Sequence, residues 1–205
     1  MMKKESIFPV EIYEFYNKDV AAECLRLFKE EPSWKNDNVP TGVKTCKSVE
    51  TNPKYQFMMD WFQSCFDEIA EDLALECDSL KANKAWGNWS PAWSGWYHSA
   101  HRHAMSYYSG VFYLTEGPPT YFVDPVQQRE WAHLHVESKK GATTGIRSYS
   151  MAKPGRFVVF PGWLIHGSLP NNDPEDRYTV ACNSFPSGEI NHGGDTYMLK
   201  LEVSK

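Results

Sequence analysis

The chain has 205 residues, of which 41% are hydrophobic and 23% charged. This composition excludes a disordered chain or a fibre, and the length fits one domain at roughly 100–200 residues per domain. The net charge is −5 and Lys and Arg form no cluster, so neither a nucleic-acid partner nor an anionic membrane is expected. Aromatic residues make up 15% of the chain, which favours a β-rich core around a walled pocket.

The sequence shows no targeting or membrane-spanning pattern. Its basic start is followed by a mixed stretch rather than an apolar signal core. The longest nearly apolar run, residues 157–165, is far shorter than the ~20 residues that span a bilayer. Five Cys residues without C-x-x-C spacing are typical of reduced thiols. These features predict a soluble cytoplasmic protein.

The first third of the sequence has helical periodicity. Asn17 can cap a helix whose apolar residues recur at three- and four-residue steps as far as Phe28. Asn52 and Pro53 form a favoured helix start, and a broad apolar stripe follows from residue 57 to about Cys77. Because each helix has an apolar face that must be covered, residues 1–83 are expected to form a helical support layer.

From about residue 84 the pattern changes to short strands separated by Gly, Pro and Asn turns. The expected strands are residues 85–89, 93–98, 101–105, 108–114, 120–123, 147–152, 156–160, 164–169, 178–185 and 196–203. Such strands predict a mainly β fold, a sandwich or barrel and most simply a double-sheet jelly roll, over residues 84–205. We expect a single domain, residues 1–205, in which the polar stretch 126–145 is an inserted loop that could serve as a lid.

Two pairs of histidines have H-x-H spacing, His101/His103 and His133/His135. Residues two apart on a strand point to the same face, so both imidazoles of a pair could reach one metal ion. The first pair is the stronger candidate because a well-patterned strand follows it. His166, in an otherwise apolar strand, would complete a three-histidine site with open coordination positions, suited to Fe(II), Mn(II), Cu or Zn. The alternative is that these are ordinary strand and core histidines.

A second candidate group follows His166. A symmetric hairpin centred between Asn171 and Asn172 would place His166 directly opposite Arg177 on a neighbouring strand. A guanidinium facing the same interior as a metal ligand is costly unless an anion lies near it, and Arg can grip a carboxylate with two hydrogen bonds. Thr179 would share that face and could donate its hydroxyl to the same carboxylate. The alternative is an Arg177 paired at the rim with an acidic neighbour, Asp176 or Glu175.

These motifs together resemble a known family. The order H-x-H (101–103), SGVFYL (109–114), WLIH (163–166) and R-x-T-x-x-x-N (177–183) resembles the 2-oxoglutarate/Fe(II)-dependent oxygenases, in particular a little-characterised bacterial and phage branch. The likeness covers about residues 86–185, and it implies that residues 84–205 form a double-stranded β-helix, a jelly roll of the cupin-like kind. It implies that His101 and His166 are metal ligands and that Arg177 binds the C5 carboxylate of 2-oxoglutarate. Thr179 would lie beside that carboxylate, and Asn183 closes the motif.

One position departs from the wider superfamily, which has H-x-D or H-x-E where this chain has His103. Either three histidines, His101, His103 and His166, hold the metal, or water or a carboxylate from elsewhere fills the second position. Asp124, at the end of the expected strand 120–123, is the best candidate carboxylate. The resemblance also implies a wall around the site, for which the sequence offers an aromatic run, Trp86, Trp89, Trp93, Trp96, Tyr97, Tyr107 and Tyr108.

The sequence therefore predicts a non-haem Fe(II)/2-oxoglutarate-dependent dioxygenase that consumes O2 and hydroxylates a small molecule or a protein side chain. Two alternatives stay open at this stage. One is a three-histidine cupin-type metalloenzyme that does not use 2-oxoglutarate, and the other is a non-enzymatic jelly-roll binding protein. Exposed strand edges would also permit a homodimer.

Overall fold

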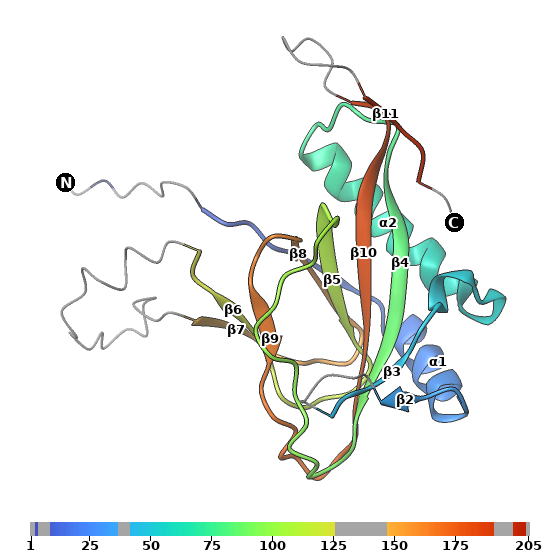
Figure 1. Ribbon diagram of the computed structural model, residues 1–205, viewed down its shortest axis with the longest axis vertical. Helices are drawn as coiled ribbons and strands as arrows, with labels where there is room; N and C mark the ends of the chain where they lie inside the picture. Colours follow the sequence, from blue (N-terminus) through green and yellow to red (C-terminus); the bar gives the residue numbers. More distant parts are fainter. Residues whose placement is uncertain (1–2, 4–8, 37–41, 126–146, 191–198, 204–205) are drawn as a thin grey trace.

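Two antiparallel sheets face each other in the computed structural model, which describes residues 3, 9–36, 42–125, 147–190 and 199–203 (Figure 1). Within these residues the strand order of the large sheet is β1 (Tyr13–Tyr16), β8 (Arg156–Pro161), β5 (Tyr108–Tyr113), β10 (Arg177–Ile190), β4 (Ser79–Ser90), β3 (Lys44–Cys46) and β2 (Lys35–Asn36). The remaining strand of this sheet, β11 (Leu199–Leu201), pairs with the end of β10. The small sheet has the order β7 (Arg147–Ser150), β6 (Thr120–Val123) and β9 (His166–Ser168). This is the mainly β, jelly-roll architecture expected from the sequence.

The first predicted helix is confirmed as α1 (Lys18–Lys29). Its cap is also confirmed, because the Asn17 side chain accepts a hydrogen bond of 3.0 Å from the backbone N–H of Val20. In Figure 1, α1 lies with α2 (Gln56–Asp72) on the outer side of the large sheet. No helix among the described residues is long and apolar enough to cross a bilayer.

The second helix differs from its prediction at both ends. Asn52 caps a short 3-10 helix, η2 (Pro53–Tyr55), and α2 follows it directly; a further 3-10 turn, η1 (Val49–Thr51), comes just before. The α2 helix ends at Asp72 rather than near Cys77. The reason is Ala74, which takes a left-handed backbone angle (φ 48°) and turns the chain toward β4.

Alternation along the strands divides the interior into two cores. On β8, Phe157 and Val159 face the helices, whereas Val158 and Phe160 face the space between the sheets. Phe157 stacks on Phe62 of α2, with ring centroids 4.5 Å apart. The larger core thus joins the helices to the outer face of the large sheet, and the inner face of that sheet is left to line a pocket.

The close contact between α2 and the large sheet depends on Phe157, whose side chain is fully buried. Phe157→Ala is expected to lower the free energy of unfolding by about 3–5 kcal/mol, because the cavity lies in a dense ring cluster. Urea unfolding would measure this loss, with Met151→Ala as the matched control because Met151 is 56% exposed. A loss below about 1 kcal/mol would mean that the helices do not anchor the sheet.

Several predicted strands are confirmed with small shifts at their ends, and β6 coincides with residues 120–123. The predicted strand 85–89 is the middle of β4, which begins earlier, at Ser79. The strands β1, β2 and β3 in the first third were not predicted, so residues 1–83 are not purely a helical layer. Of the predicted strand 196–203 only Leu199–Leu201 is described as β11, and the stretch 126–145 lies outside the described residues. The single-domain assignment stays a prediction.

The predictions of strands at residues 93–98 and 101–105 were wrong. Both segments belong to an irregular loop, in which Trp93 and Met105 take left-handed backbone angles of 54° and 55°. Backbone hydrogen bonds nevertheless hold the loop in place. His101 and His166 exchange two backbone hydrogen bonds of 2.9 Å, and the N–H of His103 donates to Gly162 O at 3.0 Å. These bonds bring the H-x-H motif beside β9.

The predicted hairpin between His166 and Arg177 was also wrong. His166 begins β9 and pairs with β6 in the small sheet, whereas Arg177 begins β10 and lies opposite Ser90 of β4 in the large sheet. The chain between them crosses from one sheet to the other. The buried side chain of Asn171 holds this crossing by donating hydrogen bonds to the carbonyl groups of Ser90, Pro91 and Glu175.

Candidate functional site

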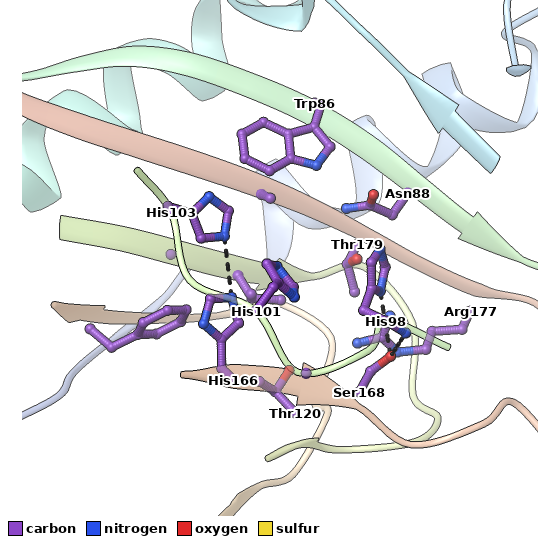
Figure 2. A pocket seen from close by; sticks show the side chains of 15 residues that line it. Trp86, Asn88, His98, His101, His103, Thr120, His166, Ser168, Arg177 and Thr179 are labelled. Carbon is purple, nitrogen blue, oxygen red and sulfur yellow. Dashed lines mark hydrogen bonds between the residues drawn. The ribbon is translucent and has the colours of Figure 1, made fainter. Parts of the chain in front are cut away.

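A pocket lies between the two sheets, lined by side chains from both and from the loop before β5 (Figure 2). Its lining residues are Trp86 and Asn88 of β4, Gly110 and Val111 of β5, Phe160 of β8, Arg177, Thr179 and Ala181 of β10, Thr120 of β6, His166, Gly167 and Ser168 of β9, and His98, His101 and His103 of the loop. Of the aromatic run expected to wall the site, only Trp86 is among them.

Three of the histidines converge. One nitrogen from each of His101, His103 and His166 can be chosen so that all three lie within 4.8 Å of one another. The Nε2 atoms of His103 and His166 are 3.2 Å apart, joined by the dashed line in Figure 2. Neighbouring nitrogens that share one ion at about 2.1 Å are expected roughly 3 Å apart, so the spacing fits a metal centre. The predicted convergence of the three rings is confirmed.

Hydrogen bonds to backbone carbonyls select which nitrogen of two rings faces the centre. The Nδ1 of His101 lies 2.7 Å from Ser99 O, and the Nδ1 of His166 lies 2.9 Å from Leu164 O. Since a carbonyl oxygen can only accept, each Nδ1 carries the proton and each Nε2 has its lone pair free. This is the usual arrangement of metal-ligating imidazoles.

Burial keeps the rings of His166 and His103 neutral. Burial first, and then the neighbouring His101, lower the pKa of His166 to about 3 and that of His103 to about 4. At neutral pH the lone pairs are therefore available to a cation. The His103 ring is stacked between Trp86, with centroids 5.5 Å apart, and His166, with centroids 5.1 Å apart and planes within 7°. This packing fixes the ring at the position where the wider superfamily has a carboxylate.

Arg177 lies at the other end of the pocket with 3% of its surface exposed. Its Nε donates to Pro118 O at 3.2 Å, and among the described residues no carboxylate pairs with it. Burial lowers the pKa of Arg177. The rim alternative is wrong, because Asp176 instead accepts hydrogen bonds from Trp89 Nε1 and the backbone N–H of Ala92. A buried guanidinium without a partner favours an anionic ligand.

The predicted partner Thr179 lines the same pocket, two residues along β10, and is 2% exposed. Asn88 of β4 lies directly opposite it. Asn88 is 5% exposed, and its Oδ1 is buried without a hydrogen-bond partner among the described residues. An unpaired buried amide oxygen is costly, which indicates that a ligand or water belongs in this part of the pocket.

Two of the described sequence candidates do not join the site. Asn183 is absent from the pocket lining, and its Oδ1 accepts a hydrogen bond of 3.0 Å from Ser109 Oγ. Asp124 follows β6, and it belongs neither to the lining nor to the histidine group. The pair His133/His135 lies outside the described residues.

Two lining residues, His98 and Asn88, were not predicted as site residues. The signal for Asn88 was its place two residues from Trp86 on one strand, which puts both on the same face. For His98 there was no comparable signal, because it lies in the loop. Its pKa is lowered to about 3, first by burial and then by the charge of Arg177. Figure 2 shows its ring between Ser168 and Thr179.

Fold and site together describe a jelly roll with a candidate three-histidine metal centre in the same pocket as the buried guanidinium of Arg177. Residues 84–183 match the family described as "Putative 2OG-Fe(II) oxygenase". The matched span contains all six predicted site residues. The resemblance drawn from the motifs, the oxygenase class and the cofactor pair of that class, Fe(II) and 2-oxoglutarate, are thereby confirmed. The comparison with curated proteins gave no match.

Solved structures confirm the fold. A prolyl-4-hydroxylase from Pseudomonas putida matches with a TM-score of 0.63 and 13% identity, over 87% of this chain and 94% of that one. The α-ketoglutarate-dependent epimerase SnoN of nogalamycin biosynthesis matches with a TM-score of 0.64 and 10% identity, over 87% and 77% of the two chains. HygX from Streptomyces hygroscopicus, crystallised with nickel and 2-oxoglutarate, matches with a TM-score of 0.59 and 10% identity, over 86% and 83%.

Proposed function

We propose that this oxygenase binds Fe(II) through His101, His103 and His166 and binds the distal carboxylate of 2-oxoglutarate through Arg177 and Thr179. The observation that carries the proposal is the presence, in one pocket, of three converging imidazoles and a buried guanidinium that has no carboxylate partner among the described residues. Burying the imidazole group and the guanidinium without a ligand costs free energy. Fe(II) bound to the imidazoles and 2-oxoglutarate bound to the guanidinium would offset this cost.

The residues of the chain would divide the work. Bound Fe(II) would supply the redox chemistry by which the family uses O2 and 2-oxoglutarate. The carbonyls of Ser99 and Leu164 orient the two imidazoles that donate to them. Arg177 and Thr179 would fix the cosubstrate at its far end, and Phe160 with Trp86 would exclude water from the metal side.

We further propose that the reaction is a hydroxylation of a small molecule or a peptide side chain. The support is structural likeness alone. Among the similar folds is the prolyl-4-hydroxylase, and another is a prolyl hydroxylase from Trichoplax adhaerens solved with a peptide fragment of hypoxia-inducible factor, with a TM-score of 0.56 and 12% identity. Other reactions also occur on this fold, since SnoN is an epimerase and SnoK a carbocyclase.

The experiment that tests the proposal is an anaerobic titration of the Fe(II)-loaded protein with 2-oxoglutarate. We expect saturable binding with a weak visible charge-transfer band. Binding without that band, or none, would favour the second candidate, a three-histidine cupin-type enzyme that does not use 2-oxoglutarate. The observation in favour of that candidate is His103, an imidazole where a carboxylate is usual, stacked on Trp86.

The ligand role of His103 gives a separate prediction. His103→Ala is expected to weaken Fe(II) binding by about 100-fold or more, since even residues that only orient ligands account for 10–100-fold. His103→Asp should recover part of the affinity, because a carboxylate can occupy the position although it cannot stack on Trp86. Competition titration against a coloured chelator would measure both variants. Wild-type affinity in His103→Ala would remove this residue from the ligand set.

A further inference from the structure

His98 lies between the metal-binding histidines and Arg177, but it does not belong to the converging group. Its ring centroid is 6.2 Å from that of His101, and the charge of Arg177 acts on it. The backbone of His98 is fixed to β9, because its N–H donates to Ser168 Oγ at 2.9 Å and its carbonyl accepts from the N–H of Ser168 at 3.0 Å. The side chain is therefore held at the end of the pocket where Arg177 lies.

Ser168 determines which nitrogen of His98 carries the proton. The Ser168 oxygen already accepts the backbone N–H of His98, and it lies 3.4 Å from His98 Nδ1. Among the described residues no other acceptor is bonded to this hydroxyl, which is therefore free to donate to Nδ1. A hydroxyl that donates there leaves the hydrogen of the ring on Nε2. Figure 2 shows the ring with one nitrogen joined to Ser168 and the other directed toward Thr179 and Asn88.

Three residues at this end of the pocket have hydrogen-bond donors without a partner among the described residues. These donors are the terminal nitrogens of Arg177, the hydroxyl of Thr179 and Nε2–H of His98. Arg177 uses only its Nε, which is bonded to Pro118 O. A carboxylate has about four lone-pair positions, so two hydrogen bonds from a guanidinium leave some of its lone pairs without a donor. A neutral imidazole can donate a hydrogen bond to one of these lone pairs without adding a second buried positive charge.

We propose that His98 is a carboxylate-binding residue of the cosubstrate site, held in its Nε2–H form by the positioning residue Ser168, and that it contributes to selecting a 2-oxo dicarboxylic acid. The inference rests on the proposed function, because it assigns a residue to the distal carboxylate of 2-oxoglutarate. It predicts a pocket that discriminates between two 2-oxo acids of equal length by the group at their far end.

The test compares two probes, 2-oxoglutarate and 2-oxopentanoate, which has the same chain length and no distal carboxylate. Both are titrated by anaerobic calorimetry into the Fe(II)-loaded wild type, His98→Ala, His98→Gln and Ser168→Ala. His98→Ala should weaken 2-oxoglutarate binding by on the order of 10- to 100-fold, the range for a hydrogen bond to a charged group. Its affinities for 2-oxopentanoate and Fe(II) should stay within about twofold of wild type.

The other variants separate positioning from packing. In His98→Gln the side-chain amide N–H can replace Nε2–H, so most of the 2-oxoglutarate affinity should return. Ser168→Ala should cost roughly three- to tenfold, because Nδ1 then loses the group that fixes the tautomer. Ser64→Ala is the matched control, since the exposed Ser64 hydroxyl on α2 donates to Trp61 O and does not line the pocket. Circular dichroism and melting temperature establish that each variant is folded.

The outcomes distinguish this inference from the proposed function. Unchanged 2-oxoglutarate binding in His98→Ala, with binding lost in an Arg177 variant, would overturn the role of His98 and leave the function intact. Equal losses for both probes, or a loss of Fe(II), would place His98 at the metal end and also overturn it. A wild-type protein that binds Fe(II) but not 2-oxoglutarate would contradict the function and the inference together.

Discussion

Replacing His166 with alanine is expected to abolish high-affinity Fe(II) binding and, with it, oxygenase activity. His166 is the only one of the three converging imidazoles that comes from a strand, and it is the most deeply buried, with 4% of its surface exposed. Its Nε2 is 3.2 Å from that of His103, and its ring centroid is 4.4 Å from that of His101. Without it, two loop residues would have to hold the ion alone.

The expected loss of Fe(II) affinity is at least about 100-fold, above the 10–100-fold that orienting residues contribute. Anaerobic competition titration with Fe(II), and with Mn(II) as a redox-stable substitute, would measure it. Ile165→Ala is the matched control, because the adjacent Ile165 side chain is 37% exposed and does not line the pocket. An affinity within threefold of wild type in His166→Ala would contradict the proposed metal centre.

Replacing Arg177 with methionine is expected to remove 2-oxoglutarate binding while leaving Fe(II) binding nearly intact. The guanidinium is 3% exposed, lacks a carboxylate partner among the described residues, and is anchored through Nε to Pro118 O. A bidentate charge-assisted bond to a buried carboxylate accounts for several kcal/mol, so a loss of about 100- to 1,000-fold in affinity is expected. Calorimetry of the Fe(II)-loaded variant would measure it.

The same substitution gives a second readout that does not depend on activity. Methionine fills a similar volume without burying a charge, so the ligand-free Arg177→Met protein should melt at the same temperature as wild type or higher. Arg102→Ala, which removes an exposed guanidinium between the two loop histidines, serves as the control for charge. If Arg177→Met lost Fe(II) as well as 2-oxoglutarate, the residue would support the fold rather than bind the cosubstrate.

Local features of the fold could be read from the sequence with good accuracy. The Asn17 cap and the strand 120–123 depend on residues that are neighbours in the chain, and the structure confirms both. The end of α2 could not be read in this way, because the apolar stripe continues beyond Asp72 while the backbone turns at Ala74. The strands β1, β2 and β3 were missed since they are short and depend on a partner strand for their pairing.

In the candidate site, too, the sequence predicted some features correctly and others wrongly. The sequence analysis grouped His101 and His103 with His166, and it explained the grouping by a shared strand face. That explanation was wrong, because backbone hydrogen bonds from the loop to β9 and to Gly162 bring the residues together. Likewise Arg177 shares a pocket with His166 across two sheets rather than within a hairpin. The motifs therefore predicted which residues lie together, although the predicted strand and hairpin geometry was wrong.

By itself the sequence determined the jelly-roll class, the oxygenase family and the chemical types gathered for the site, because these follow from strand patterning and from motifs of a few adjacent residues. Only the tertiary structure decided the positions of His98, Asn88 and Trp86 around that motif. Their surroundings are formed by side chains that are far apart in the chain. His98 contacts the hydroxyl of Ser168, Trp86 stacks on the imidazole of His103, and the amide oxygen of Asn88 is buried without a partner among the described residues. Such contacts are set by how two sheets pack, and no periodicity along one strand encodes that packing.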